Sequence, residues 1–289
     1  MTTIEEWVAA RTGSVTLGPA TRRVVEILVT QPQLASYAST AEMASRARVN
    51  VATVVRTARM LGFSGWPELR LELRSRYLAT LSANQVLAEH RGIASDPISA
   101  AIRCDIENLE TLARTTDLAA VRAVAGAMHT ARRTVVIGSG SFAAPGVQLA
   151  HIGQTMGRDV VLQNSFGTQL VNSLGRLRPG DCLVTVNLWW LPREVLEATR
   201  MAYEREITTC VVTDVRSSVV ADVATHLVVV PSEGISSFPS LTPAMAVVHA
   251  VLAELAQLGG DETMRAMARA EADWSRMGLF TSSQQGPLA

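Results

Sequence analysis

Apolar residues in roughly the first 130 positions recur three and four residues apart, which is the period of an amphipathic α-helix. The pattern predicts short helices over residues 4–10, 19–31, 40–47, 51–61 and 67–81. Two longer amphipathic helices are expected over residues 97–113 and 117–128. The first of these carries an apolar stripe formed by Ile98, Ile102, Ile106, Leu109 and Leu112. Helices that join a small domain to a second domain often pair with another subunit, and we expect the same here.

From residue 133 the pattern changes to short apolar runs that alternate with helical segments. The expected strands cover residues 134–137, 159–163, 181–187, 207–213 and 226–230, and two helices over 243–258 and 261–277 follow. Apolar strands that alternate with helices predict a parallel sheet with helices on both faces. The expected fold class is therefore an α/β domain with a five-stranded parallel sheet, preceded by an all-α domain.

Residues 40–62 have the pattern of two short helices joined by a tight polar break. Thr40 can cap the first helix, and Asn50 can cap the second because its side-chain oxygen accepts a hydrogen bond from a free backbone N–H. Gly62 ends the second helix as a C′ glycine. The expected buried stripe is Val51, Val54, Val55, Ala58 and Leu61, and the expected polar face is Ala52, Thr53, Arg56, Thr57 and Arg59.

Two short helices, a turn of about three residues and an arginine-bearing second helix are typical of a helix-turn-helix. The second helix of such a motif enters the major groove, where arginine contacts phosphate or guanine and threonine contacts a base edge. The candidate DNA-binding residues are Thr40, Arg48, Asn50, Ala52, Thr53, Arg56, Thr57 and Arg59. The alternative is a helical hairpin whose basic face is only solvated.

The distribution of charge favours the DNA-binding interpretation. The whole chain has 26 basic and 26 acidic residues and a formal net charge of zero. Residues 46–76 contain seven arginines and two glutamates, which gives this segment a net charge of +5. A basic segment on a neutral protein is the expected electrostatic footprint of a protein that binds DNA.

Residues 41–73 resemble the N-terminal domain of RpiR-type (MurR/RpiR) bacterial transcriptional regulators. The matching positions are residues 53–56 (Thr-Val-Val-Arg), 61–63 (Leu-Gly-Phe), Gly65 and 68–69 (Glu-Leu). Asn50 replaces the usual serine, and both residues are good N-caps. The resemblance implies a DNA-binding helix-turn-helix domain in a transcriptional regulator.

Composition narrows the class of protein further. A length of 289 residues with 48% apolar residues suggests two domains with a sizeable core. Cys104, Cys182 and Cys210 are far apart in apolar surroundings, so we expect reduced thiols and a cytoplasmic protein. The five histidines show no metal-ligand spacing, and no apolar run reaches the roughly 18 residues of a membrane span. Neither a metal nor a membrane contact is expected, and the first residues lack the apolar segment of a signal peptide.

Small residues follow the first expected strand. Residues 138–141 (Gly-Ser-Gly-Ser) lie where a strand ends and a helix begins, so a ligand could approach their backbone N–H groups. The dinucleotide fingerprint requires a third glycine and an acidic residue after the next strand, and the sequence has Ala144 and Asn164 near these positions. We therefore expect no cofactor.

The second half of the chain, about residues 115–260, resembles a SIS domain, the sugar-isomerase fold that binds phosphosugars. The matching positions are residues 138–141, Gly180, Asp181, Glu194, Ala198, residues 212–214, Ala221 and Asp222. The resemblance implies a SIS-type three-layer α/β/α domain. A helix-turn-helix domain joined to a SIS domain is the architecture of the RpiR family.

The loop after the third expected strand departs from the SIS pattern. That family usually has Ser-x-Ser-Gly-x-Thr there, whose hydroxyl and N–H groups hold the phosphate, whereas residues 187–192 are Asn-Leu-Trp-Trp-Leu-Pro. Trp189 and Trp190 could stack on a ligand or fill an interface, and we favour packing or an interface. The candidate effector-binding residues are Ser139, Gly140, Ser141, Asn187, Trp189, Ser236 and Ser237.

The predicted domains are a helix-turn-helix domain at residues 1–81, a linker at 82–96, a SIS-like effector-binding and oligomerisation domain at 97–280, and a disordered tail at 281–289. The expected function is a transcriptional regulator that binds a double-stranded DNA operator as a homodimer or homotetramer. Its effector would be a small molecule, with a sugar phosphate as one candidate. In one alternative the SIS domain binds no ligand and serves only dimerisation. In another the protein is a phosphosugar isomerase with Glu233 or His249 as the base, but neither belongs to a recognisable catalytic constellation, so we expect no enzyme activity.

Overall fold

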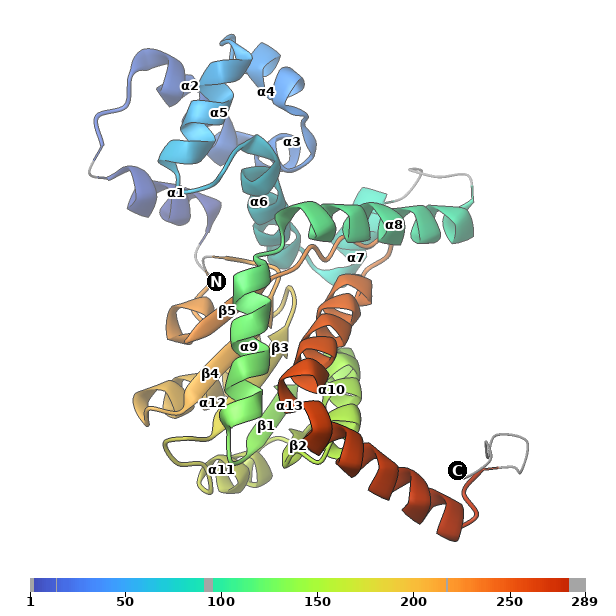
Figure 1. Cartoon of the computed structure of the whole chain (residues 1–289). Helices are drawn as coiled ribbons and strands as arrows, with labels where there is room; N and C mark the ends of the chain where they lie inside the picture. Colours follow the sequence, from blue (N-terminus) through green and yellow to red (C-terminus); the bar gives the residue numbers. More distant parts are fainter. Residues whose placement is uncertain (1–2, 14, 91–95, 217, 281–289) are drawn as a thin grey trace.

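The computed structural model describes residues 3–13, 15–90, 96–216 and 218–280, which form a helical domain and an α/β domain (Figure 1). The helical domain contains α1 (Ile4–Thr12), α2 (Pro19–Thr30), α3 (Pro32–Tyr37), α4 (Thr40–Arg46), α5 (Val51–Met60), α6 (Trp66–Thr80) and α7 (Ala83–His90). The α/β domain begins with α8 (Pro97–Thr115) and α9 (Leu118–Thr130). The sequence predicted all of these helices except α3 and α7.

The helices of the first domain pack around one apolar core. Its fully buried members on α2, α4 and α5 are Val24, Leu28, Met43, Val54 and Ala58. Trp66, Leu69 and Leu73 of α6 belong to the same core. The indole Nε1 of Trp66 also donates to the carbonyl of Ala38 at 2.9 Å. Because α5 and α6 share this core, a movement of α6 carries α5 with it.

Two helices lie where the sequence predicted a break or a linker. Pro32 follows α2 as expected, but it also occupies the first turn of α3. Proline has no backbone N–H, and the N–H groups in the first turn of a helix have no partner within the helix, so nothing is lost there. The helix α7 lies inside the segment predicted as a linker at 82–96, and its Val86 is fully buried beside Leu78 and Trp189. The rest of that linker, residues 91–95, lies outside the described residues.

The strands of the second domain form a parallel sheet. They are β1 (Thr134–Gly138), β2 (Val160–Gln163), β3 (Cys182–Asn187), β4 (Thr208–Thr213) and β5 (His226–Val229), in the order β2-β1-β3-β4-β5. The chain reverses direction across the sheet between β1 and β3, whose ends are paired at Gly138 and Val186. Ligands of such sheets bind beyond the carboxyl ends of the strands at this switch point.

Helices cover both faces of the sheet. They are α10 (Ala143–Thr155), α11 (Thr168–Leu174), α12 (Arg193–Glu204) and α13 (Thr242–Arg276). Together with α9, the helices α10 and α13 cover one face, while α11 and α12 cover the other (Figure 1). Neighbouring strand residues serve opposite layers, as Val184 packs in the first and Leu183 in the second. The predicted three-layer fold with five parallel strands is confirmed.

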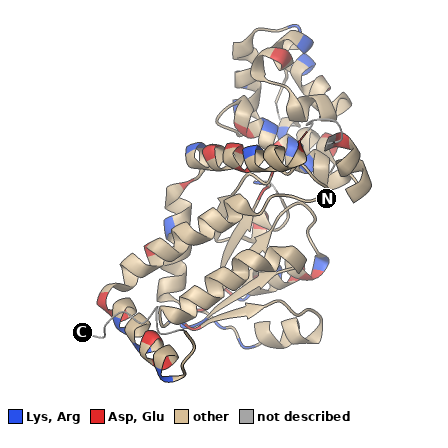
Figure 2. Cartoon of the chain, turned by 90° about the vertical axis from the view of Figure 1, so that its right-hand side faces the viewer, with Lys and Arg blue, Asp and Glu red and all other residues tan. Residues whose placement is uncertain are grey.

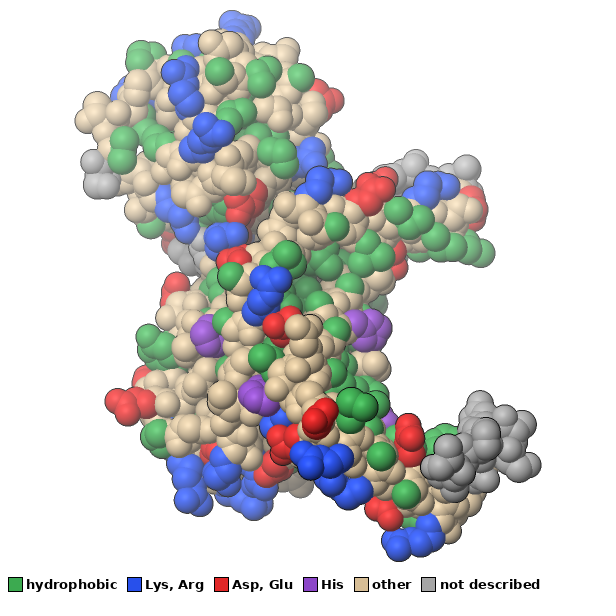
Figure 3. Space-filling view, viewed as in Figure 1, with side chains coloured by type: hydrophobic (Ala, Val, Ile, Leu, Met, Phe, Trp, Pro, Cys, Tyr) green, Lys and Arg blue, Asp and Glu red, His purple; other side chains and the backbone are tan. Residues whose placement is uncertain are grey.

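The apolar stripe predicted on α8 is exposed along most of its length, as Figure 3 shows. Its exposed members are Ile98, Ile102, Ile106 and Leu109, with exposed fractions of 74%, 59%, 51% and 38%. Leu112 is buried in the core of the α/β domain. Asn108 is buried on the same side of α8 as Leu112 and donates through Nδ2 to the carbonyl of Glu233 at 2.8 Å. A contiguous apolar stripe left uncovered in this way marks an interaction surface.

The last helix, α13, consists of two helical segments that meet at a kink at Gly260, where φ of 46° and ψ of −128° are not helical. The two helices that the sequence predicted here lie on either side of this kink. The length and hydropathy of α13 fit a membrane span, but Val247, Val251 and Leu255 are buried in the α/β core, as in the core helix of a folded domain. The second half of α13 extends away from the domain (Figure 1). The predicted tail at 281–289 lies outside the described residues.

Gly138→Ala should destabilise the protein by about 1–3 kcal/mol, because overpacking a filled site costs about that much. A Cβ at Gly138 would lie 2.6 Å from the carbonyl oxygen of Phe142, which is part of the backbone. The matched control is Gly126→Ala in α9, where nothing lies within 4 Å of the added Cβ and alanine should stabilise the helix by about 0.5–1 kcal/mol. Urea unfolding measures both variants, and equal midpoints would contradict this account of Gly138.

Candidate DNA-binding helix and the carboxyl edge of the sheet

Side-chain caps begin both helices of the predicted helix-turn-helix. The hydroxyl of Ser39 accepts from the backbone N of Glu42 at 3.2 Å, and the Glu42 carboxylate accepts from the backbone N of Ser39 at 2.6 Å. This capping box starts α4, so the prediction that Thr40 is the cap is wrong by one residue. Asn50 caps α5 as predicted, because its Oδ1 accepts from the backbone N of Thr53 at 2.8 Å.

The turn between α4 and α5 is fixed by backbone hydrogen bonds. Val49 N donates to the carbonyl of Ala44 at 2.9 Å, and Arg48 N donates to the carbonyl of Ser45 at 3.1 Å, as in a Schellman ending. Arg48 has a left-handed φ of 51°, which is uncommon for a residue with a side chain. Arg23 of α2 supports this conformation by donating to the carbonyl of Arg48 at 3.2 Å. The side chain of Arg48 remains exposed.

A chain of hydrogen bonds from the cap holds Arg56 in place. The Nη2 of Arg56 donates to the hydroxyl of Thr53 at 3.2 Å, and that hydroxyl donates to Oδ1 of Asn50 at 2.8 Å. Ala52, Arg56 and Arg59 are all exposed. The helix α5 therefore presents an oriented guanidinium group to solvent rather than a freely rotating one.

The exposed face of α5 is rotated from the predicted one. Thr53 and Thr57 are 5% and 1% exposed, whereas Val51, expected to be buried, is 49% exposed. A buried threonine is tolerated when its hydroxyl is satisfied, and Thr57 Oγ1 donates to the carbonyl of Thr53 at 2.8 Å. The prediction that Thr53 and Thr57 lie on the polar face is wrong, and neither side chain is accessible to DNA in this conformation. Thr53 instead orients Arg56.

The basic segment at residues 46–76 is divided between two surfaces. Its exposed arginines on the helix-turn-helix are Arg46, Arg48, Arg56 and Arg59. Arg74 and Arg76 face the junction with the α/β domain, where Arg76 is 3% exposed and pairs with Glu72 at 2.9 Å. Figure 2 shows charged residues of both signs gathered at that junction. The net charge predicted from the sequence is therefore not one continuous DNA-facing patch.

The predicted effector residues do not surround one cavity. Residues 139–141 follow β1, and the pairing of Gly138 with Val186 places them beside Asn187 at the end of β3. Trp189 turns toward α6, away from this group. Ser236 lines a separate hollow of about 440 Å³ beneath α8, and Ser237 lies in the same loop. The sequence correctly placed residues 139–141 and Asn187 at one edge of the sheet, but the other three candidates belong to different surfaces.

Asn187 is buried with an unused hydrogen-bond acceptor. It is 3% exposed, and it pairs with Thr213 of β4 in the sheet. Its Oδ1 has no hydrogen-bond partner among the residues that the structure describes. A buried acceptor without a donor costs about 1–3 kcal/mol. A bound molecule that supplied a donor at this point would therefore be stabilised.

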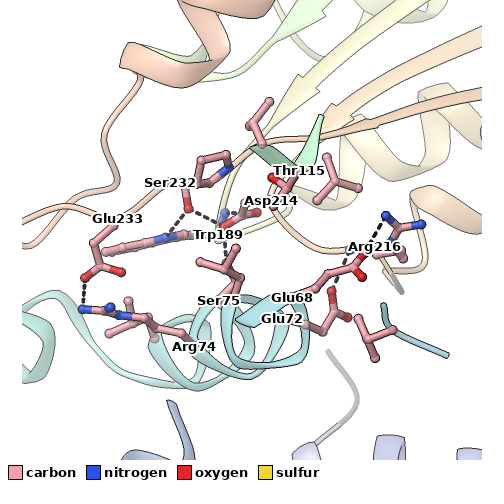
Figure 4. Close-up of a pocket in the computed structure, with 16 residues that line it drawn as sticks. Glu68, Glu72, Arg74, Ser75, Thr115, Trp189, Asp214, Arg216, Ser232 and Glu233 are labelled. Atoms are coloured by element: carbon pink, nitrogen blue, oxygen red, sulfur yellow. Dashed lines mark hydrogen bonds and ion pairs between the residues drawn. The ribbon is translucent and has the colours of Figure 1, made fainter. Parts of the chain in front are cut away.

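Trp189 lies between the two domains and lines a small hollow of about 40 Å³ there (Figure 4). Its backbone is left-handed, with φ of 56°, and its side chain packs against Leu78 of α6 and Val86 of α7. Its Nε1 donates to the hydroxyl of Ser232 at 3.1 Å. The interface favoured for this tryptophan is thus formed within one chain. Its neighbour Trp190 is 40% exposed.

Asp214 is the buried acceptor at the centre of this contact. It follows β4, and its Oδ2 accepts from the hydroxyls of Ser75 on α6 at 3.0 Å and Ser232 at 2.7 Å. Its Oδ1 accepts from the backbone N of Trp189 at 3.1 Å. Burial raises the pKa of Asp214, and the hydrogen bonds from these donors oppose that rise. One carboxylate therefore binds residues of both domains at once.

Charged contacts extend the junction on either side of Asp214. The backbone N of Arg216 donates to Glu72 at 2.8 Å, and its guanidinium pairs with Glu68 at 2.8 Å. On the other side, Arg74 pairs with Glu233, whose side chain is 17% exposed. Burial raises the pKa of Glu233 to about 7, and the charge of Arg74 opposes the rise. These pairs attach α6 to the loops that follow β4 and β5.

The two candidate bases lie on different elements and do not face each other's partners. Glu233 is occupied by the interdomain ion pair, and His249 lies on the exposed side of α13 with its ring 3.3 Å from Gln148. Among the described residues, no group of three or more His, Cys, Asp or Glu side chains is arranged to hold a metal ion. Cys182 and Cys210 are free buried thiols, with sulfurs 3.7 Å apart.

Residues 11–80 match the helix-turn-helix domain of the rpiR family. The α/β domain is similar to a solved sugar isomerase domain of an RpiR transcription factor from Sphaerobacter thermophilus. The two are 29% identical with a TM-score of 0.58, over 60% of this chain and 97% of that one. This chain joins an RpiR-family helix-turn-helix domain to a SIS-like sugar isomerase domain.

Other proteins with similarity to this chain include two regulators. The HTH-type transcriptional regulator HexR of Pseudomonas aeruginosa is 27% identical over 65% of this chain and 66% of its own. An uncharacterized HTH-type transcriptional regulator of Haemophilus influenzae is 27% identical over 42% of this chain and 43% of its own. This chain therefore matches just under two thirds of HexR and less than half of the Haemophilus influenzae regulator. The Vibrio vulnificus NanR protein, solved in complex with ManNAc-6P, shares the fold with a TM-score of 0.60 and 19% identity, over 94% of this chain and 98% of that one.

Glu233→Gln should flatten the dependence of thermal stability on pH. The pKa of Glu233 is about 7 in the folded protein and ordinarily 4.5, so between these values the folded state binds more protons than the unfolded state. Stability should therefore fall as pH rises from about 4.5 to 7 and level off above, and the glutamine variant should lose this decline. The charges that face Glu233 are Arg70 and Arg74 on α6 and Glu107 on α8.

The matched control for this measurement is Glu110→Gln, because the side chain of Glu110 is 64% exposed on α8. Melting temperatures measured from pH 5 to 8 on the three proteins decide the matter. A wild-type curve that rises over this range, or a Glu233→Gln curve that parallels it, would show that Glu233 does not titrate as described.

Proposed function

We propose that this RpiR-type chain is a cytoplasmic transcriptional regulator that binds double-stranded DNA through α5. The observation that carries the proposal is Arg56, which is exposed on the second helix of the motif and oriented by Thr53 and Asn50. An arginine fixed in this way loses less side-chain entropy when it binds a base edge or a phosphate. The similarity to two HTH-type transcriptional regulators supports the same function.

The proposed interface consists of the exposed side of α5 and the turn before it. Arg56 and Ala52 face the base edges, since the N-terminal half of a recognition helix lies deepest in the major groove. Arg48 in the turn and Arg59 near the end of α5 contact the flanking phosphates. Asn50 keeps its role as the cap and brings the free N–H groups at the start of α5 close to a phosphate.

The protein binds DNA as an assembly of identical subunits, with the exposed stripe on α8 as a contact between two copies. The stripe of Ile98, Ile102, Ile106 and Leu109 runs along the exposed side of α8. When two α8 helices pair in antiparallel orientation, the stripe of one copy packs against the same stripe of the other, as a two-fold interface requires. Two DNA-binding helices related in this way fit a palindromic operator.

The SIS-like domain binds a small metabolite at the ends of β1 and β3. Residues 139–141 offer backbone N–H groups at the start of α10, and Asn187 offers a buried acceptor without a partner among the described residues. A sugar phosphate is the class that the SIS-like fold suggests. Such a ligand regulates DNA binding only if its affinity differs between two arrangements of the subunits.

A second candidate role for the SIS-like domain is dimerisation alone. The observation that favours it is Trp189, which lies in the loop after β3 and packs against the helical domain, so that the hollow beside it is only about 40 Å³. In that case the domain brings two helix-turn-helix units together and responds to no metabolite.

Arg56→Ala should weaken binding to a duplex that the wild-type protein has selected from a random-sequence library. The expected loss is about 1–3 kcal/mol, with a relaxed base preference at one position, because a bidentate contact to guanine is worth about that much. The matched control is Arg276→Ala at the far end of α13, where the side chain is 82% exposed. Fluorescence anisotropy at several salt concentrations measures both variants.

A different outcome would reassign Arg56. A fall of about one in the salt slope with an unchanged base preference would make it a phosphate contact. Affinity equal to that of wild type would remove Arg56 from the interface. A wild-type protein that selects no duplex at low salt would refute the regulator itself.

Ile102→Glu should convert the assembled protein to smaller species, since it places a charge in the centre of the apolar α8 stripe. Ile102 is 59% exposed in the single chain, so the variant should fold normally. The matched control is Val171→Glu on α11, at a side chain that is 54% exposed and away from α8. Sedimentation equilibrium gives the mass of each protein. If Val171→Glu dissociates the assembly and Ile102→Glu does not, the contact lies elsewhere.

A further inference from the structure

The helix α6 belongs to both domains. Its residues Trp66, Leu69 and Leu73 are buried in the same core as Val54 of α5. Its later residues meet the carboxyl edge of the sheet, where Ser75 donates to Asp214. The position of α5 relative to the SIS-like domain is therefore determined by how α6 sits on that edge.

The contact at the edge depends on buried acceptors that lie beside a small hollow of about 40 Å³. Asp214 is 5% exposed and Ser75 is 8% exposed, and the hydroxyl of Ser75 donates to the Asp214 carboxylate at 3.0 Å. Glu72, 3% exposed, accepts from the backbone N of Arg216 at 2.8 Å. Breaking a buried, charge-assisted hydrogen bond leaves the charge uncompensated. The domains are thus held in one arrangement as long as this contact stays closed (Figure 4).

Trp189 closes the contact from the side of the SIS-like domain. Its backbone N binds Asp214, its indole N binds Ser232, and its ring fills the space beside Leu78 and Val86. A tryptophan that is 3% exposed between two domains contributes a large apolar area to both. Its left-handed backbone conformation persists only while these surroundings hold it.

The loop that carries Trp189 begins at Asn187. Asn187 is the last residue of β3, at the switch point of the sheet, and its buried Oδ1 has no partner among the described residues. Any ligand that donates a hydrogen bond to Asn187 binds two residues from the tryptophan that joins the domains. A change in this loop therefore reaches α6 without passing through the rest of the sheet.

We propose that Trp189 is a latch that fixes α5 relative to the SIS-like domain, and that the loop from Asn187 to Trp189 is the point at which the state of the sheet edge controls DNA binding. This inference rests on the proposed function and extends it to a mechanism of regulation. With the latch closed, the two DNA-binding helices of a dimer keep a fixed spacing and bind both halves of a palindrome together. With the latch open, each helical domain moves separately and the gain from simultaneous binding is reduced.

The first test compares Trp189→Ala with Trp190→Ala, its exposed neighbour in the same loop, by amide hydrogen exchange of the full-length proteins without DNA. Trp189→Ala should speed exchange in α6 and α7 while β1 and β3 stay as protected as in wild type. Trp190→Ala should leave all four elements unchanged. Wild-type exchange in α6 and α7 of Trp189→Ala would overturn the latch, and so would an equal effect of both variants.

The second test uses the palindrome selected by the wild-type protein and a duplex that holds one of its halves. Trp189→Ala should lower the affinity for the palindrome by about fivefold or more, in the usual range of coupling between sites, and leave the affinity for the half-site unchanged. An equal loss on both duplexes, or no loss on either, would overturn the coupling. If Trp189→Ala does not fold, Ser75→Ala removes one hydrogen bond across the same contact and takes its place.

The two tests separate the latch from the proposed function. The hydrogen-exchange measurement needs no DNA. If the protein selects no duplex, the proposed regulatory function is refuted, but the first test still decides whether Trp189 holds α6. A protein that binds its palindrome, with the Trp189→Ala variant behaving as wild type in both tests, would leave the regulator intact and refute the latch.

Discussion

The buried carboxylate of Asp214 is the constraint on which the arrangement of the two domains depends. Removing a charged carboxylate from water is unfavourable unless hydrogen bonds replace those of the solvent. Ser232 and the backbone N of Trp189 supply two of these bonds from the α/β domain, and Ser75 supplies one from α6. Because one of the donors comes from α6, the helical domain is held against the SIS-like domain by a specific contact.

This contact also decides how the arginines of the chain are used. Arg74 and Arg76 are committed to Glu233 and Glu72, so they are withdrawn from any DNA-facing surface. The helix α5 is left with Arg56 and Arg59 exposed. Together with Arg46 and Arg48 beside it, this leaves four exposed arginines on the helix-turn-helix, and each phosphate contact adds only part of the affinity. A second subunit in a fixed position is then the most direct source of additional affinity for DNA. The α8 stripe would provide the second subunit, and the α6 contact would fix its DNA-binding helix in position.

Much of the fold follows from patterns that are local in the sequence. Short apolar runs predicted the five strands and period-3.6 spacing predicted most helices, and Asn50 and Gly62 marked the ends of α5 correctly. The rotation of α5 could not be predicted in the same way. Valines and threonines are mixed along this helix, and threonine can face the core only when its hydroxyl is satisfied, as that of Thr57 is by its own backbone. The capping of α4 by Ser39 in place of Thr40 is a similar case of two suitable neighbours.

The sites were harder to predict because their members are distant in the chain. Trp189 and Leu78, or Asp214 and Ser75, lie more than a hundred residues apart, and no local signal relates them. The short polar helix α7 has one fully buried residue, Val86, whose partner is Trp189, so its helical state depends on the other domain. Sequence reasoning did identify the loop at residues 187–192 as a departure from the SIS pattern, which was the available signal.

The replacement of that loop has a physical consequence for regulation. Hydroxyl and glycine residues at the end of β3 would leave room for a phosphate and make no apolar contact with a neighbouring domain. Trp189 excludes a bulky anion from its own position and buries a large apolar surface against α6 and α7 instead. The contact of Trp189 with the helical domain thus stabilises the loop after β3, which a bound ligand would otherwise stabilise. An effector that acts here must compete with the packing of Trp189. To open the contact between the domains, it must bind the open arrangement more tightly than the closed one by at least the free energy of that packing.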